Sequence, residues 1–403
     1  MGAWLGRNGK LIVIFLTGLL CRLIVSVMFF GSHDVTVQIH HAYMIRVGLP
    51  AWTSKLPVAY YVPPAMAIVA EKTNIPKHVA QELPAIAGDL LAAFLLVGIA
   101  SRRGRERERW LWPAIYLLNP VTIILSAYHG NIDPVMAAMM LWSLDLRWRD
   151  KPIASGLAIG LAIAMKPTAL LALPVLLIPP RRKGNIALGA TGILFPIAIC
   201  VPFAMTDPTF GRFLLTYSGM YGNWGVSMLF RQSENVAKQL FDAPEIVRNI
   251  LYALNEALQS VGKYLLALIL VDWLIHLTRR WRIDSFEKNA AAMAATYLVF
   301  YVFATGFGPQ YLCFAVPFLL IASTRLSLIH CALLTPYLIV VYMHAALYSN
   351  PDAESPITTR LQSLTDEHLS LLVAHGTFAL LAWLACIWVL WKLVRVEESA
   401  QAA

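Results

Sequence analysis

Long apolar stretches with few charges recur from one end of this chain to the other. Apolar residues make up 58% of the 403 positions and charged residues only 14%, against roughly 25% charged residues in an average soluble domain. A run of about 20 apolar residues can cross a bilayer as a helix, in which the backbone polar groups bond to one another. The pattern therefore predicts an all-α polytopic membrane protein. It excludes a soluble enzyme, a disordered chain and a disulfide-stapled secreted domain.

Basic residues predict how these helices alternate across the bilayer. The formal net charge is +9, and Lys and Arg gather in short segments between apolar runs, such as the arginine-rich residues 102–109. Short loops rich in Lys and Arg remain on the cytoplasmic side, so topology explains the charge and no nucleic-acid partner is expected. We expect residues 1–403 to form a single integral domain of about 12 transmembrane segments in the plasma (inner) membrane, with both termini cytoplasmic.

Three longer connections fall on the predicted outer, periplasmic face, namely residues 31–83, 204–260 and 348–367. In the first of these, residues 35–47 have helical apolar spacing, which predicts an interfacial helix. The apolar residues 58–70 are interrupted by Pro63–Pro64, and we expect this stretch to be broken and interfacial or re-entrant. Long loops held by a rigid scaffold often carry function, so the active site is expected on this outer face.

Asp34 directly follows the predicted outer end of the first helix. A carboxylate where lipid and water meet could act as a general base toward a lipid-linked substrate. A solvated loop carboxylate, or an N-cap for a helix that begins at Val35, explains the position equally simply. His33, His40 and His41 lie nearby, but their spacing matches no standard ligand set, so no metal ligands are assigned and polar contacts are expected instead.

A very short outer turn between two apolar helices concentrates His129, Asn131 and Asp133. Turn chemistry alone would explain Gly130, Asn131 and the Asp133–Pro134 pair. An acidic residue at a helix end that faces a cavity is, however, a candidate binding residue. Both interpretations stay open at this point.

Three charged residues lie inside apolar stretches. Lys166 directly precedes Pro167, which predicts two short helices that meet at a break. A cation at a broken helix suits an anionic phosphate, and a lysine that extends to the interface is the alternative. Arg22 and Asp89 have opposite charges in the first two predicted spans, so we expect them to pair in a structural role.

Polar and aromatic residues of the later outer segments are further candidates. Trp224 and Arg231 lie in the second long loop, where they could stack on a sugar and contact a phosphate. An interfacial aromatic belt would also explain the tryptophan. Gln310 and Tyr311 follow a tight turn that brings an amide and a phenol to the mouth of the bundle.

Taken in order, these segments resemble the GT-C class of integral membrane glycosyltransferases. The resemblance is greatest to mannosyltransferases that use polyprenol-phosphate sugars, including the GPI mannosyltransferase I type and bacterial relatives. It rests on these segments: Asp34, Gly48–Leu49–Pro50, Tyr60–Tyr61–Val62–Pro63–Pro64, Asp89, Leu118–Asn119–Pro120, Gly130–Asn131–Ile132–Asp133, Lys166–Pro167–Thr168, and Gln310–Tyr311 followed by Pro317.

The resemblance implies a GT-C fold, Asp34 as the catalytic base, inversion at the anomeric carbon, and a lipid-phosphate sugar donor bound at the outer leaflet. Many relatives have a pair of acidic residues where this chain has His33–Asp34, and charged residues where it has Gly308–Pro309. No cofactor is therefore assigned, and a requirement for a divalent cation (Mg²⁺ or Mn²⁺) stays open.

The leading hypothesis is a glycosyltransferase that moves a hexose, with mannose as the favoured sugar, from a polyprenyl-phosphate donor to a lipid or glycan acceptor. Asp34 is the expected catalytic residue. The expected donor-phosphate residues are Lys166, Arg231, Gln310 and Tyr311. The expected sugar or acceptor residues are His33, His41, Tyr61, His129, Asn131, Asp133 and Trp224.

Two alternatives belong to other functional classes. In a secondary transporter or lipid flippase, Lys166, Asp89 and Asp272 would mark the transport path. Such proteins often have paired broken helices, whereas the sequence predicts one broken segment without a counterpart. A polymerase or ligase that joins two lipid-linked glycans would share the topology but use a lipid-diphosphate oligosaccharide donor.

Overall fold

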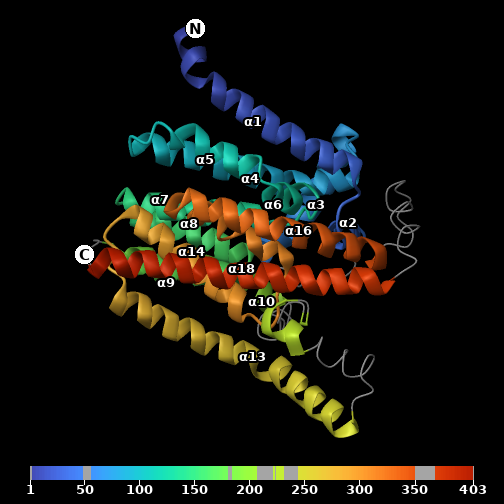
Figure 1. Ribbon diagram of the computed structural model, residues 1–403. Helices are drawn as coiled ribbons and strands as arrows, with labels where there is room; N and C mark the ends of the chain where they lie inside the picture. The colour runs from blue at the N-terminus through green and yellow to red at the C-terminus, as the bar shows by residue number, and fades with distance from the viewer. Residues whose placement is uncertain are drawn as a thin grey trace.

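The computed structural model describes residues 2–48, 56–179, 184–206, 221–222, 224–230, 244–349 and 368–402. Over these residues the chain is helical and contains no β-strand, only an isolated bridge between Tyr221 and Gly306. The predicted all-α class is therefore confirmed. The chain ends, at the N-terminus of α1 and the C-terminus of α18, lie at the left of Figure 1, and α2 lies at the right.

The first half of the chain contains α1 (Gly2–Met28), α2 (His33–Arg46), α3 (Pro57–Thr73), α4 (Lys77–Arg102), α5 (Glu108–Leu117), α6 (Pro120–Ala127), α7 (Asp133–Trp148), α8 (Pro152–Met165), the 3-10 helix η1 (Pro167–Leu171), α9 (Ala172–Leu177) and α10 (Asn185–Thr206). The second half contains α13 (Glu245–Arg280), α14 (Phe286–Phe303), the 3-10 helix η2 (Pro309–Cys313), α15 (Val316–Ala322), α16 (Thr324–Ser349) and α18 (His368–Ala402).

Six of these helices are long and apolar enough to cross a membrane, or seven if the bent pair α5–α6 is one span. Three more apolar segments, α8, η1–α9 and η2–α15, are shorter than a span. The expectation of about 12 segments stays a prediction.

The boundaries of two predicted loops differ from the helices observed. The helix expected over residues 35–47 is present as α2, and α3 covers residues 58–70, but α4 already begins at Lys77, inside the expected loop 31–83. Helix α13 begins at Glu245, inside the expected loop 204–260, and continues to Arg280. Its first turns carry polar residues, so apolar runs alone do not indicate where this helix begins. Residues 350–367, most of the third expected loop, lie outside the described residues.

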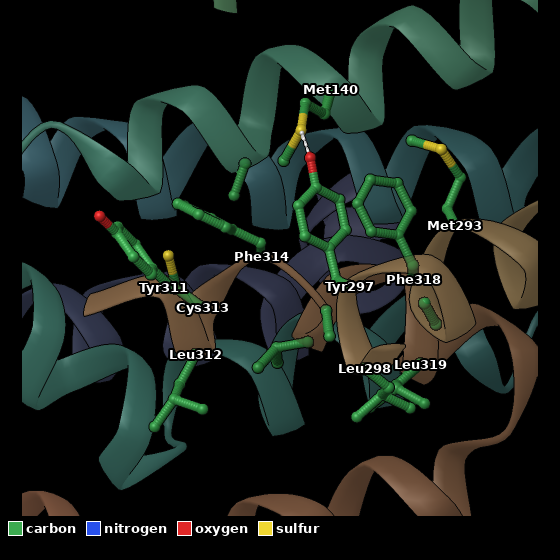
Figure 2. Packing of buried hydrophobic residues seen from close by; sticks show 14 of the residues in the cluster. Met140, Met293, Tyr297, Leu298, Tyr311, Leu312, Cys313, Phe314, Phe318 and Leu319 are labelled. Atoms are coloured by element: carbon green, nitrogen blue, oxygen red, sulfur yellow. Dashed lines mark hydrogen bonds between the residues drawn. The ribbon is translucent and has the colours of Figure 1, made fainter. Parts of the chain in front are cut away.

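The core of the bundle lies around α14, which is buried along nearly its whole length. The helix carries alanine at 290, 291, 292, 294 and 295, and small residues let neighbouring helices approach closely in a membrane protein. Figure 2 shows Tyr297 of α14 directed at Met140 of α7, and its hydroxyl lies 2.8 Å from the Met140 sulfur. On the side of α7, the helices α4, α7, α8 and α10 pack against one another in that order.

The predicted pairing of Arg22 and Asp89 is confirmed. Both side chains are fully buried, and the Arg22 guanidinium donates to Asp89 Oδ2 at 2.8 and 3.0 Å. It also donates to the carbonyl of Leu117 at 2.6 Å. That carbonyl lies at the break between α5 and α6, where the Val121 N–H that would bond to it bonds to Asn119 Oδ1 instead. The two charges therefore neutralise each other, and Arg22 also supplies a donor to a carbonyl left free at a helix break. This is a structural role.

Helix breaks are more numerous than the sequence suggested. The expected break at Lys166 is present between α8 and η1. The apolar segment 108–127 also breaks, by 53° between Leu117 and Pro120, and a 3-10 helix precedes α15. The expectation of a single broken segment was therefore wrong.

The expected break at Pro63–Pro64 is absent, because α3 continues through both prolines. Pro64 has no N–H to offer the Tyr60 carbonyl. His41 of α2 donates from Nε2 to that carbonyl instead, at 3.1 Å. Gln81 of α4 donates to the Pro63 carbonyl at 3.0 Å. The His41 side chain thus replaces a missing backbone donor, and Gln81 adds a second contact between helices; no local pattern could predict either.

Candidate active site

Helix α2 begins at a cap that places Asp34 in its first turn. Ser32 is the N-cap residue, and its Oγ accepts a hydrogen bond from the Asp34 N–H at 3.2 Å. Asp34 is therefore not the cap, contrary to one of the two simple interpretations of its position. A carboxylate in the first turn is favoured by the partial positive charge of a helix N-terminus. The Asp34 side chain is 37% exposed, so molecules outside the protein can reach it.

The start of α2 is joined to the turn that follows α6. The Ser32 N–H donates to the Tyr128 carbonyl at 2.9 Å, and Ser32 Oγ lies 3.0 Å from His129 Nδ1. Gln38, one helical turn further along α2, donates to the Gly130 carbonyl at 3.2 Å. These bonds hold two segments together that lie 97 residues apart in the sequence.

Two side chains of that turn contact the Asp34 carboxylate directly. Asn131 donates from Nδ2 to Asp34 Oδ2 at 2.8 Å, and His129 Nε2 lies 3.3 Å from the same oxygen. The tertiary structure therefore brings together three residues that the sequence offered as separate candidates. Burial raises the pKa of the neighbouring Tyr128 phenol to about 12, so it is neutral and cannot act as a base at physiological pH.

A buried ion pair lies two residues further along the same turn. Lys166 Nζ lies 2.7 Å from Asp133 Oδ1, with exposed fractions of 16% and 1% for the two side chains. The ammonium also lies over the Tyr311 ring, 4.5 Å from its centroid. Asp133 is the first residue of α7, and Lys166 has extended backbone at the break after α8. Lys166 is thus held by a partner inside the bundle and does not extend to the interface.

The segment 129–133 links the two groups of residues into one site. Its first part contacts Asp34, and Asp133 contacts Lys166. Asp133 Oδ2 is buried without a hydrogen-bond partner among the residues that the structure describes. A single turn therefore contacts the partly exposed carboxylate of Asp34 and the paired cation of Lys166, and it carries the unsatisfied acceptor Asp133 Oδ2.

Glu82 lies beneath this turn, and the sequence analysis did not single it out. It is fully buried near the start of α4 and bonds to the Ser26 hydroxyl of α1. Gly31 and Gly130, which have φ values of +94° and +66°, both pack on it. A Cβ on Gly31 would lie 2.8 Å from Glu82 Oε1, and one on Gly130 would lie 2.7 Å from Glu82 Cγ. The helical apolar spacing that continues back to Val79 was the signal that could have placed Glu82 on a helix.

The other predicted donor-phosphate residues have varied positions. Tyr311 is buried in η2 beneath Lys166, and Gln310 is partly buried with its amide folded over Gly308. Arg231 lies outside the described residues.

The other predicted sugar or acceptor residues also differ in surroundings. His33 and Tyr61 are exposed, and the Tyr61 ring lies 5.6 Å from that of Phe203. His41 is buried between α2 and α3, where it bonds to the Tyr60 carbonyl. Trp224 is fully buried, donates to the Tyr301 carbonyl at 2.7 Å, and stacks on Phe307. In this conformation its ring supports the core and offers no face to a sugar.

Among the residues that the structure describes, no three or more His, Cys, Asp or Glu side chains converge as ligands. At Asp34 the close polar neighbours are an amide and an imidazole, a set that offers a hard cation only one carboxylate.

Comparisons with known proteins agree with this architecture. The model of glycosyltransferase family 87 matches residues 60–307, more than half of the chain. GPI mannosyltransferase 1 of Eremothecium gossypii is 37% identical over 99 residues, which are 24% of each chain. GPI mannosyltransferase 1 of Kluyveromyces lactis is 28% identical over 138 residues, 33% of this chain and 34% of that protein. The matches thus span about a quarter to a third of the length of these relatives.

The whole fold has a solved counterpart. The crystal structure of ArnT from Cupriavidus metallidurans bound to undecaprenyl phosphate superposes with a TM-score of 0.52 and 14% identity. The superposition covers 98% of this chain and 79% of ArnT. The family match begins after Asp34, so it includes the turn 129–133 and Lys166 but does not test the first-loop acid. With its apolar helices and this fold, the chain belongs to glycosyltransferase family 87 and is a membrane-embedded glycosyltransferase of the GT-C type.

Proposed function

We propose that this enzyme transfers a hexose from a polyprenyl-phosphate donor to a lipid or glycan acceptor, with Asp34 as the general base. The observation that carries the proposal is the placement of Asp34, partly exposed and oriented by Asn131 and His129, on the turn that also contacts Lys166. Two relatives are named as mannosyltransferases, and the structural neighbour was crystallised with undecaprenyl phosphate. The structural neighbour supports the donor class, and the two relatives favour mannose.

The proposed reaction needs one carboxylate as the base and one phosphate as the leaving group. Asp34 accepts the proton of an acceptor hydroxyl, and the oxygen forms a bond to the anomeric carbon from the face opposite the lipid phosphate. The bond between that carbon and the phosphate oxygen breaks, and the electron pair leaves with the polyprenyl phosphate. The configuration is thereby inverted. Asn131 donates to Asp34 Oδ2 and so fixes the direction in which the carboxylate faces.

Lys166 is the proposed cation for the leaving phosphate. Its ammonium has three donors, and the bond to Asp133 Oδ1 uses one of them. The negative charge of Asp133 offsets the cost of keeping the lysine inside the bundle before substrate binds. Charge that develops on the phosphate then meets a cation that is already in position, which is the largest single catalytic effect in many enzymes. Gln310 and Tyr311 next to this cation, and Arg231, would complete the phosphate contacts.

The sugar is proposed to lie against the turn 129–133. Asp133 Oδ2 is buried and has an unused acceptor capacity, so a donor-sugar hydroxyl is a suitable partner. His33 and Tyr61 are exposed and are proposed to contact the acceptor. We place this end of the bundle on the periplasmic side of the inner membrane, because the arginine-rich ends of α4 and α7 lie at the other end of the same helices.

The test is transfer by purified protein from a panel of polyprenyl-phosphate hexoses to membrane lipid acceptors. We expect one donor to react and Asp34→Asn to lower turnover by about 10²–10⁴-fold, the range of general-base catalysis. Asp284→Asn, which changes an exposed carboxylate elsewhere, is the matched control and should keep wild-type turnover. Equal turnover by wild type and Asp34→Asn would refute the base assignment.

Two further arms of the same experiment address the other open questions. Lipid-diphosphate oligosaccharides in the donor panel test the polymerase or ligase reaction, which would use them in place of a monophosphate sugar. Parallel reactions with a chelator, then with Mg²⁺ or Mn²⁺ restored, test the need for a divalent cation. Asp89 does not support the transporter hypothesis, because its carboxylate is occupied by a buried ion pair with Arg22.

A further inference from the structure

A second charged site lies at the opposite end of the bundle from Asp34. Helices α4 and α7 both begin near the turn 129–133 and end at this second site. The 26 residues of α4 correspond to about 39 Å of helix. The helix ends surround a hollow of about 480 Å³ whose charged lining consists of Arg102, Arg103, Arg105, Asp145, Arg149 and Glu287. We refer to it as the arginine hollow.

Positive charge exceeds negative charge in the arginine hollow. Asp145 pairs with Arg102 at 2.7 Å and with Arg149 at 3.4 Å. Glu287 pairs with Arg105 at 2.9 Å, and its distance to Arg103 is 3.3 Å. Four guanidinium groups therefore share two carboxylates, which leaves two positive charges uncompensated. Each guanidinium has five N–H donors, so many donors stay available to an added anion.

The arginines are held in orientations that suit an anion with oxygen acceptors. The Arg103 guanidinium lies 4.0 Å from the centroid of the Phe286 ring, and Trp148 and Ile99 supply apolar walls. Stacking on an aromatic face holds the planar group while leaving its edge donors free for phosphate. Arginines needed only for topology would not have to converge on one hollow.

The depth of the hollow identifies the kind of anion. It opens where the apolar span Lys77–Arg102 ends, which is the level of lipid headgroups in a bilayer. Cytoplasmic leaflets carry anionic lipids that attract basic clusters at this level. The volume is also within the range of small-molecule pockets, about 300–1,000 Å³.

We propose that the arginine hollow binds the phosphate of an anionic phospholipid headgroup, on the membrane face opposite the Asp34 site. Free inorganic phosphate presents the same oxygen acceptors to the arginines, so the experiment below distinguishes a lipid headgroup from free phosphate. The inference does not depend on the proposed transferase reaction, because no residue of the hollow belongs to that site.

The double substitution Arg103→Gln and Arg149→Gln tests the proposal. It removes the excess charge and leaves Asp145 and Glu287 each with the shorter of its ion pairs. The matched control is Arg279→Gln with Arg280→Gln, which removes two exposed charges from the end of α13 outside the hollow. A monodisperse elution profile establishes that each variant is folded, and the single variant Arg149→Gln replaces the double variant if that one is not.

The measurement is native mass spectrometry of the full chain after equilibration with mixed micelles of phosphatidylglycerol and phosphatidylcholine. We expect wild type to retain phosphatidylglycerol preferentially, and the double variant to lose about 10- to 30-fold of that preference, from the usual attraction per basic residue. The control, and Asp34→Asn, should keep the wild-type preference. Equal preference in wild type and the double variant, or an equal loss in the control, would overturn the proposal. Binding of millimolar inorganic phosphate that the double variant loses, together with no preference of wild type for phosphatidylglycerol, would show that the hollow takes free phosphate and refute the lipid as its occupant.

Discussion

The two ends of α4 and α7 carry similar numbers of charged groups. These groups differ in how deeply they are buried and in the backbone that positions them. At the Asp34 end, Glu82 and the Lys166–Asp133 ion pair are largely buried, and irregular backbone at Gly31, Gly130 and Lys166 positions the site. At the arginine hollow, the ion pairs lie at the C-terminal ends of α4 and α7, at the start of α14 and in the turn after α4, and the arginines are between 30% and 43% exposed. Charges in a dry environment interact strongly and are costly to leave alone, whereas solvent screens exposed ones. The first region should therefore be sensitive to single substitutions, and the second should act through its total charge.

The largest difference between the two ends should appear when one cation is removed from each, Lys166 at the Asp34 end and Arg149 at the arginine hollow. Lys166→Met would leave the Asp133 carboxylate buried and unpaired, which costs about 3–5 kcal/mol in the free energy of unfolding. The measurement is the thermal midpoint of purified protein. Adding Asp133→Asn should recover much of the loss, because the charge is then gone, while transferase activity stays low. A midpoint unchanged by Lys166→Met would show that the pair is not buried in the folded protein.

A pair of glycines sharpens the same comparison. Gly130 and Gly104 have φ values of +66° and +65°, but only Gly130 has a neighbour where a Cβ would lie. Gly104→Ala at the arginine end should cost about 1 kcal/mol from backbone strain alone. Gly130→Ala should cost about 1–3 kcal/mol more through its collision with Glu82 and Val35, and it should also lower turnover because the turn moves. Equal costs in chemical denaturation would mean that Glu82 does not support the turn.

Asn131→Ala should affect turnover more than stability. Loss of one charge-assisted hydrogen bond to Asp34 leaves the carboxylate less well oriented, and we expect kcat to fall about tenfold with KM nearly unchanged. Gln38→Ala is the matched control, since it removes a side-chain bond to Gly130 of the same turn and keeps the Asn131 bond to Asp34. Its kcat should fall by less than that of Asn131→Ala, and the reverse order would argue against Asn131 as the residue that positions the base.

The smallest effect is expected at the arginine hollow. Arg149→Met removes a 3.4 Å pair from Asp145, which keeps Arg102. We expect a change below about 1 kcal/mol that disappears at high salt. Thermal midpoints at low and high ionic strength would measure it. A loss as large as that of Lys166→Met would mean that the two ends do not differ in the way proposed.

Several features of the fold and of the site could be predicted because they depend on local or compositional signals. Apolar runs predicted the all-α membrane class, Pro167 predicted the break after Lys166, and opposite charges in two apolar spans predicted the pairing of Arg22 with Asp89. The order of weak motifs indicated the glycosyltransferase family. The continuity of α3 was mispredicted, because His41 from another helix satisfies the Tyr60 carbonyl that Pro64 leaves without a donor.

The sequence by itself determined that this chain enters a membrane as helices, that one of them breaks at Lys166, and which polar residues could carry chemistry. The tertiary structure decided which of those residues meet. It joined Asp34 to Asn131, paired Lys166 with Asp133, placed Glu82 beneath two glycine turns, and buried Trp224 in the core. The physical reason is that hydrophobicity and proline geometry act over a few neighbouring residues. The partner of a buried polar group is set by packing between helices far apart in the chain.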